Sequence, residues 1–101
     1  MRYNIVMKTP AGLRYGTMTL RMMENQVYGT LDLLEHSESF RGSVEQDGSC
    51  RICGSLVTLM RTIRYTAVGK LSPKAITLSL QGERNIFEIT GIAVPESEVE
   101  A

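Results

Sequence analysis

Apolar and polar residues alternate one by one over most of the chain. In residues 15–22, one side of the alternation holds Gly16, Met18, Leu20 and Met22, and the other holds Tyr15, Thr17, Thr19 and Arg21. Successive side chains of a β-strand point to opposite faces, so this pattern predicts a strand with one core face and one hydroxyl-rich, charged face. The alternation recurs along residues 27–33, 40–45, 63–67, 76–80 and 87–91. Eight strands of this kind fit the chain.

Short turn-forming segments separate the predicted strands at regular intervals. They are Thr9–Gly12, Glu24–Gln26, His36–Glu38, Asp47–Ser49, Ser72–Lys74 and Gly82–Arg84. Asp-Gly favours a tight hairpin because Gly takes a positive φ without a steric penalty, and Ser-Pro pre-sets φ for a type I turn. One further turn near Met60–Thr62 would complete the spacing of a strand meander.

The segment from residue 55 to residue 65 carries a conflicting signal. Its apolar residues Leu56, Leu59, Met60 and Ile63 have the spacing of a helical stripe. The β-branched residues around them are stiff in helices and suit strands, and no N-cap marks a helix start after Gly54. The sequence favours a hairpin here over a short helix.

Glycines form a second regular pattern on the apolar side of the strands. Gly16, Gly29, Gly42 and Gly54 follow one another at intervals of 12 or 13 residues. Glycine weakens a strand and buries no side chain, so a compensating role is expected. Either these glycines let the strands coil tightly enough to close a barrel, or they leave room for a ligand. Closure is the simpler explanation.

These patterns predict an all-β fold, an eight-stranded antiparallel up-and-down meander that closes into a small barrel. Closure removes the exposed edges of an open sheet. The predicted barrel is similar in strand number and strand order to lipocalin-like and streptavidin-like barrels, a likeness of architecture that extends to no motif. A two-sheet β-sandwich is the alternative. We expect one domain over residues 1–94, followed by an acidic tail over residues 95–101.

Composition and the N-terminal sequence limit which kinds of partner and which cellular compartment we expect for the protein. The 101 residues are 43% hydrophobic and carry 11 basic and 11 acidic side chains. The balanced charge gives no electrostatic reason to expect a nucleic-acid partner, and the dispersed apolar residues do not form a membrane span. No signal peptide is recognisable at the N-terminus, so we expect a cytoplasmic protein with reduced thiols.

The candidate chemical groups are few. Cys50 and Cys53 have the spacing of a metal or redox pair, but a separation of three in a strand sends the sulfurs to opposite faces. A structural zinc site needs four ligands, and His36 is the single histidine, so no metal or cofactor is expected. The inward positions of the alternation hold no ionisable side chain, which argues against an enzyme.

Charges at the turns suggest a ligand entrance. The first, third, fifth and seventh turns of a meander meet at one end, and here they collect Lys8, Arg14, His36, Arg61, Arg64 and Arg84, against Glu35, Glu38 and Glu83. A basic mouth above an apolar interior suits an amphipathic anion. We therefore expect a non-enzymatic binding protein for a small hydrophobic or amphipathic anionic molecule. The residues expected to line or guard its site are Met18, Leu31, Arg61, Arg64 and Tyr65.

The alternative function is that of a structural or interaction protein. Val57 and Leu59 point outward if Ile52 and Leu56 point inward, which makes one strand apolar on both faces. A strand of this kind is covered by a partner, most simply a second copy of the chain in a homodimer.

Overall fold

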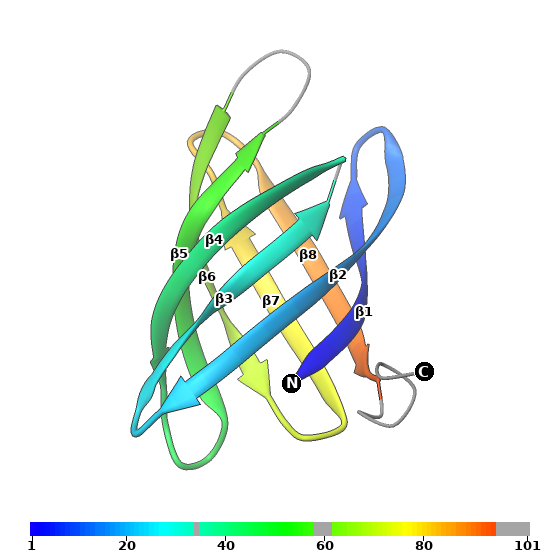
Figure 1. Cartoon of the computed structure of the whole chain (residues 1–101). Coiled ribbons are helices and arrows are strands. Elements are labelled where there is room, and N and C mark those ends of the chain that lie inside the picture. The colour runs from blue at the N-terminus through cyan, green and yellow to red at the C-terminus, as the bar shows by residue number, and fades with distance from the viewer. Residues whose placement is uncertain (34, 58–61, 95–101) are drawn as a thin grey trace.

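The structure is a computed structural model that describes residues 1–33, 35–57 and 62–94. Eight strands follow one another along the chain (Figure 1). They are β1 (Arg2–Thr9), β2 (Gly12–Met23), β3 (Gln26–Leu33), β4 (His36–Val44), β5 (Ser49–Val57), β6 (Thr62–Leu71), β7 (Ala75–Gln81) and β8 (Ile86–Ala93). No helix in this part of the chain is long and apolar enough to cross a bilayer.

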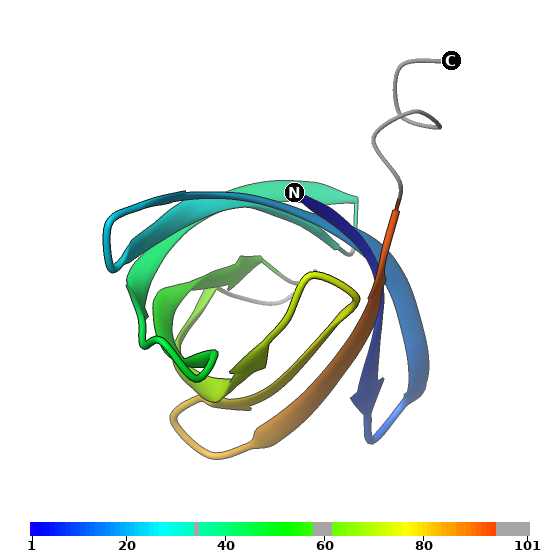
Figure 2. The same cartoon turned by 90° about the horizontal axis from the view of Figure 1, so that it is seen from below.

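The strands form a closed antiparallel barrel. Each strand pairs with the next, and β1 pairs with β8 from Tyr3 opposite Ala93 to Lys8 opposite Glu88. Figure 2 looks into this barrel from the end where the N-terminus lies. The predicted eight-stranded meander is therefore confirmed, and the two-sheet sandwich is excluded.

The ambiguous segment is a strand pair. β5 and β6 remain antiparallel neighbours as far as Leu56 opposite Ile63 and Val57 opposite Thr62. The apolar residues at the two ends of the helical stripe, Leu56 and Ile63, therefore belong to strands, as the β-branched side chains favoured. The turn predicted near Met60–Thr62 falls largely on residues 58–61, which lie outside the described residues.

One predicted turn is wrong. His36–Glu38 does not reverse the chain but opens β4, with His36 opposite Leu33. The reversal comes just before it, where Glu35 takes a φ of 66°. A polar run looks like a turn in the sequence, but these residues continue the alternation of β4.

Apolar side chains of all eight strands fill the barrel. The buried set consists of Tyr3, Ile5, Met7, Met18, Leu20, Val27, Leu31, Leu33, Phe40, Cys50, Ile52, Leu56, Ile63, Tyr65, Ala67, Leu71, Ile76, Leu78, Leu80, Phe87 and Ile89. No polar or charged residue is fully buried in residues 1–33, 35–57 and 62–94. The predicted inward phase of the alternation is confirmed strand by strand.

The inward glycines mark places where neighbouring backbones come close. A Cβ on Gly29 would overlap the carbonyl oxygen of Thr19, and one on Gly69 would overlap that of Thr77. Beside Gly54 the space is taken by the ring of Tyr65, whose hydroxyl oxygen lies 2.6 Å from a Cβ placed there. Of the two explanations, the geometry supports tight coiling for closure, because no empty waist remains at these positions.

Candidate ligand-binding site

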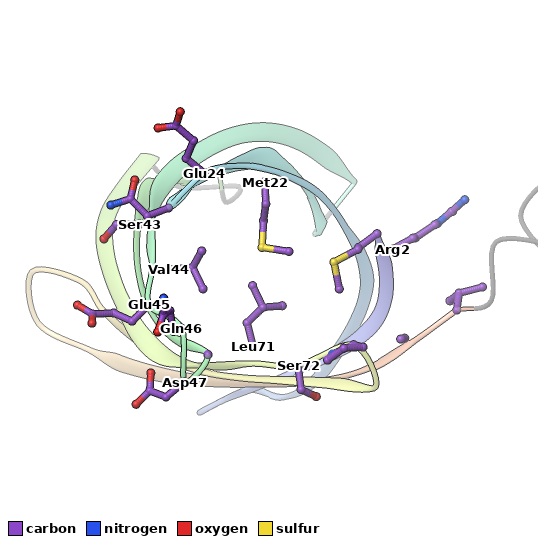
Figure 3. Close-up of a pocket in the computed structure, with 16 residues that line it drawn as sticks. Arg2, Met22, Glu24, Ser43, Val44, Glu45, Gln46, Asp47, Leu71 and Ser72 are labelled. Atoms are coloured by element: carbon purple, nitrogen blue, oxygen red, sulfur yellow. The ribbon is translucent and has the colours of Figure 1, made fainter.

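A hollow lies at the end of the barrel that carries the β2–β3, β4–β5 and β6–β7 turns. It has a volume of about 1220 Å³ and opens to solvent at the barrel mouth. Met22, Val44 and Leu71 point into it from β2, β4 and β6 (Figure 3). This volume exceeds the roughly 300–1,000 Å³ of typical ligand pockets, so the hollow has room for a small molecule between its inward apolar side chains. We refer to it as the mouth hollow.

Charged side chains surround the mouth hollow without entering it. Arg2, Glu24, Glu45 and Asp47 line its rim and point away from its centre (Figure 3). Hydrogen bonds from Ser49 lower the pKa of Asp47, whose Oδ1 accepts from the Ser49 amide at 2.9 Å. The rim is therefore wet and charged, while the inside offers contacts mainly to apolar groups.

Two protonated side chains support the mouth hollow from the inner face of the barrel. Tyr3 and Cys50 lie opposite the lining residues Ala93 and Val44 in the strand register. Burial, with a smaller contribution from Cys50, raises the pKa of Tyr3 to about 12. Burial likewise raises the pKa of the Cys50 thiol. Neither group carries charge near neutral pH, so both behave as part of the apolar support.

The predicted interior residues belong to the packed centre of the barrel. Met18 and Leu31 face each other across β2 and β3 and are only 1% and 2% exposed. Neither lines the mouth hollow. Their inward direction agrees with the predicted phase, but the centre is filled by side chains and leaves the open space at the end.

Two of the other predicted residues lie toward the Arg-rich end. Arg64 and Tyr65 line a smaller hollow of about 390 Å³, and Arg61 lies outside the described residues. At this end Tyr65 and Phe87 are buried in the barrel, and at the opposite end Tyr3 is buried while Val44 and Ala93 are partly buried. The sequence interpretation placed the entrance at the Arg-rich end, part of which, residues 58–61, lies outside the described residues.

One inward carboxyl group was missed. Glu38, on β4, lies opposite the buried Leu31 of β3 and is itself half-buried at the edge of the interior. Burial, followed by the charges of Cys53 and Glu38, raises the pKa of Tyr65 to about 12. The alternation of β4, extended back from Phe40 by one step, reaches Glu38, a residue that the polar run places in a predicted turn. The interior edge therefore holds one ionisable group that the sequence analysis did not place there.

The cysteines lie on opposite faces of β5, as predicted from their spacing. Cys50 is buried, whereas Cys53 is exposed, with its sulfur 3.9 Å from the Thr66 hydroxyl oxygen. Both are free thiols. In the described ranges, no three His, Cys, Asp or Glu side chains gather closely enough to hold a metal ion.

Comparisons with known proteins extend to the fold. No protein-family model matches the chain. No curated protein matches it significantly. Among solved structures it is similar to a redesigned β-barrel, mFAP1, bound to DFHBI, with 12% identity, a TM-score of 0.73 and coverage of 91% of this chain and 92% of that chain. It is also similar to the redesigned β-barrel b11L5F_LGL, with 11% identity, a TM-score of 0.66 and coverage of 93% and 90%. At these identities the likeness establishes the barrel fold alone.

Proposed function

We propose that the protein binds a small apolar or amphipathic molecule in the mouth hollow. The observation that carries the proposal is an open apolar recess, formed by Met22, Val44 and Leu71, at one end of an otherwise filled barrel. The apolar part of the ligand packs between these side chains, and its polar part remains at the wet rim. The mFAP1 barrel, which shares the fold, is bound to DFHBI, which supports the use of such a barrel as a ligand carrier.

The rim favours a neutral or cationic polar group on the ligand. Glu24, Glu45 and Asp47 surround the recess, with Arg2 as their basic counterpart on the rim. The anionic ligand expected from the sequence belonged to the Arg-rich end. A site at the acidic end favours a neutral or cationic ligand instead of an anionic one, because the negative charges of the rim act on the part of the ligand that stays exposed.

The proposed role is binding without catalysis, in the cytoplasm. Tyr3 and Cys50 beside the recess stay protonated because burial raises the pKa of both groups, and the charged rim residues point outward. An activated nucleophile or a general base needs the opposite environment. Free thiols at Cys50 and Cys53 fit a reducing compartment.

A hydrophobic dye tests the binding proposal. Nile red, which is neutral, should gain fluorescence with the purified protein and lose most of that gain in Val44→Trp, because the indole fills the recess. Val68→Trp is the matched control, since Val68 is exposed on the outer wall. Equal fluorescence in both variants, or none with the native protein, would contradict the proposal.

A second candidate, a homodimer, is favoured by an apolar groove on the outer wall. Tyr15 and Ile92, each 72% exposed, flank a hollow of about 560 Å³ that Ile5 and Gly16 also line. The same patch thus offers projecting side chains and a recess to receive them, which a two-fold interface requires. Val57, expected to form the contact, is half-buried on another strand, and Leu59 lies outside the described residues.

Sedimentation velocity at about 100 μM tests this second candidate. We expect a dimer that becomes a monomer in Tyr15→Glu/Ile92→Glu. A monomeric native protein at this concentration would exclude the homodimer and would leave the ligand proposal untouched.

A further inference from the structure

Basic side chains gather on one part of the outer wall, although the whole chain has no net charge. They project outward from β2, β4, β5 and β6, each next to at least one buried inward residue, and they are Arg21, Arg41, Arg51, Arg64 and Lys70. Within strands β2–β6, all in the described part of the chain, Asp32 is the acidic residue on this outward face, and Asp47, in the β4–β5 turn, lies near Lys70. We call this surface the basic wall.

The strand register arranges part of the basic wall as a row with an aromatic centre. Arg21 lies directly opposite Tyr28, and Tyr28 lies directly opposite Arg41. Opposite Cα atoms of paired antiparallel strands lie about 5 Å apart. The Cα atoms of Arg21 and Arg41 therefore lie about 10 Å apart, one on each side of the Cα atom of Tyr28. Tyr28 is 43% exposed.

Arg51 extends this row onto the next strand. It lies opposite Ser43, one diagonal step from Arg41, and such diagonal neighbours are about 7–8 Å apart. Arg64 and Lys70 continue the wall on β6. The balanced composition does not predict this cluster of basic residues, because the residues come together through the register of five strands and are not neighbours in the sequence.

Hydroxyl groups fill the space next to the arginine row. Thr19, Thr30 and Ser39 form the adjoining cross-strand row. The carboxylate of Asp32, which would repel an anion, accepts hydrogen bonds from the hydroxyls of Thr17 and Ser37. Arginine and hydroxyl side chains are the groups that contact phosphate and sugar in nucleic-acid complexes.

We propose that the basic wall binds single-stranded nucleic acid. The guanidinium groups of Arg21, Arg41 and Arg51 hold consecutive phosphates, and Tyr28 provides a surface on which a base stacks. The wall is convex, so a flexible strand can follow it, whereas a rigid duplex touches it along one line. An acidic protein segment would use the arginines but would leave the exposed aromatic face without a stacking partner.

This binding is independent of the mouth hollow. The basic wall uses outward side chains, while the recess is lined by inward ones such as Val44 and Leu71. Val44→Trp should therefore leave oligonucleotide binding unchanged. Loss of one activity without the other shows which of the two proposals has failed.

The test is fluorescence anisotropy with a fluorescein-labelled oligo(dT) of about 16 nucleotides, the upper end of the usual site size of an OB-fold barrel. The native protein should bind it, and Arg21→Gln/Arg41→Gln should weaken binding by about tenfold or more and lower the log–log salt slope by about 1.4, as expected for two lost phosphate contacts. Lys74→Gln/Arg84→Gln removes the same charge from exposed turn residues and should change the affinity less than about twofold. Tyr28→Leu should weaken binding without changing the salt slope.

Three results would overturn the proposal. One is no anisotropy change with the native protein at low salt. Another is an equal loss in the two double variants, which would indicate general charge attraction. The last is displacement of the oligonucleotide by a lower concentration of polyglutamate than of unlabelled oligo(dT), which would assign the wall to an acidic protein. Far-UV circular dichroism of each variant confirms that the barrel is folded.

Discussion

The hydroxyl of Tyr3 donates a 2.6 Å hydrogen bond to the carbonyl oxygen of Ser72. Tyr3 is on β1 and Ser72 is in the turn between β6 and β7, so the bond joins residues 69 positions apart in the chain. Ser72 also lines the mouth hollow. This bond therefore fixes the β6–β7 turn beside the proposed ligand site.

Replacing Tyr3 by Phe should lower the free energy of unfolding by about 1 kcal/mol, the usual net value of a hydrogen bond. The loss arises because the Ser72 carbonyl loses its phenol donor while the ring packing stays. Urea unfolding measures the change, and Tyr15→Phe is the control because Tyr15 is exposed on the outer wall. Equal stabilities of the native protein and Tyr3→Phe would contradict the role of this bond.

Alkaline pH should destabilise the barrel through its two buried tyrosines. Burial raises the pKa of Tyr3 and Tyr65 from 10.0 to about 12. Below pH 10 both phenols are protonated in the folded and unfolded chains, so these groups leave stability independent of pH. Between pH 10 and 12 the unfolded chain loses its phenol protons first, and the free energy of unfolding falls.

Urea unfolding at several values between pH 8 and pH 11.5 checks this dependence. Tyr3→Phe/Tyr65→Phe should show a shallower decline above pH 10 than the native protein. A decline of the same steepness in both proteins would mean that other groups cause the alkaline loss.

A methyl group at Gly69 should disrupt the barrel wall. A Cβ there would overlap the backbone carbonyl of Thr77 on β7, and backbone cannot move aside as a side chain can. We expect Gly69→Ala to cost about 3 kcal/mol, the upper part of the range for over-packing. In Gly82→Ala the added carbon meets the Cγ2 of Ile63 at 3.0 Å, a contact that a small side-chain shift relieves. Thermal unfolding that is unchanged in Gly69→Ala would contradict the close approach of β6 and β7.

The β2–β3 turn should accept a stabilising substitution. Glu24 has a φ of 58°, in the left-handed region that is unfavourable for residues with a Cβ. Glu24→Gly removes that strain at the expense of backbone entropy, and we expect a net gain of about 0.5–1 kcal/mol. Glu88→Gly, in the extended backbone of β8, should instead be destabilising. A lower melting temperature for Glu24→Gly would contradict the strain at this turn.

Most of the fold could be predicted from local sequence patterns. Alternation depends only on which face of a strand a side chain occupies, so the inward positions of β2, β3 and β7 were correct. The pattern is harder to follow where the inward residue is polar, and Glu38 was assigned to a turn for that reason. Inward glycines predicted close strand approach because a Cβ at such a position has no room.

The position of the hollow and the arrangement of surface charge could not be predicted in this way. The hollow depends on how the inward side chains of all eight strands fill the barrel, a property of three-dimensional volume. The row of Arg21, Tyr28 and Arg41 depends on the register of three strands. Turn charges alone pointed to the opposite end, since they carry no information on the space inside.

Methyl-resolved NMR with a neutral amphiphile, 1-octanol, tests the central claim most directly. If the mouth hollow is the ligand site, saturable shifts appear for the methyl groups of Met22, Val44 and Leu71, and the methyl groups of Met18 and Leu31 in the packed centre change little. Shifts confined to the Arg-rich end around Ile63, or no saturable shift at any methyl group, would contradict the account.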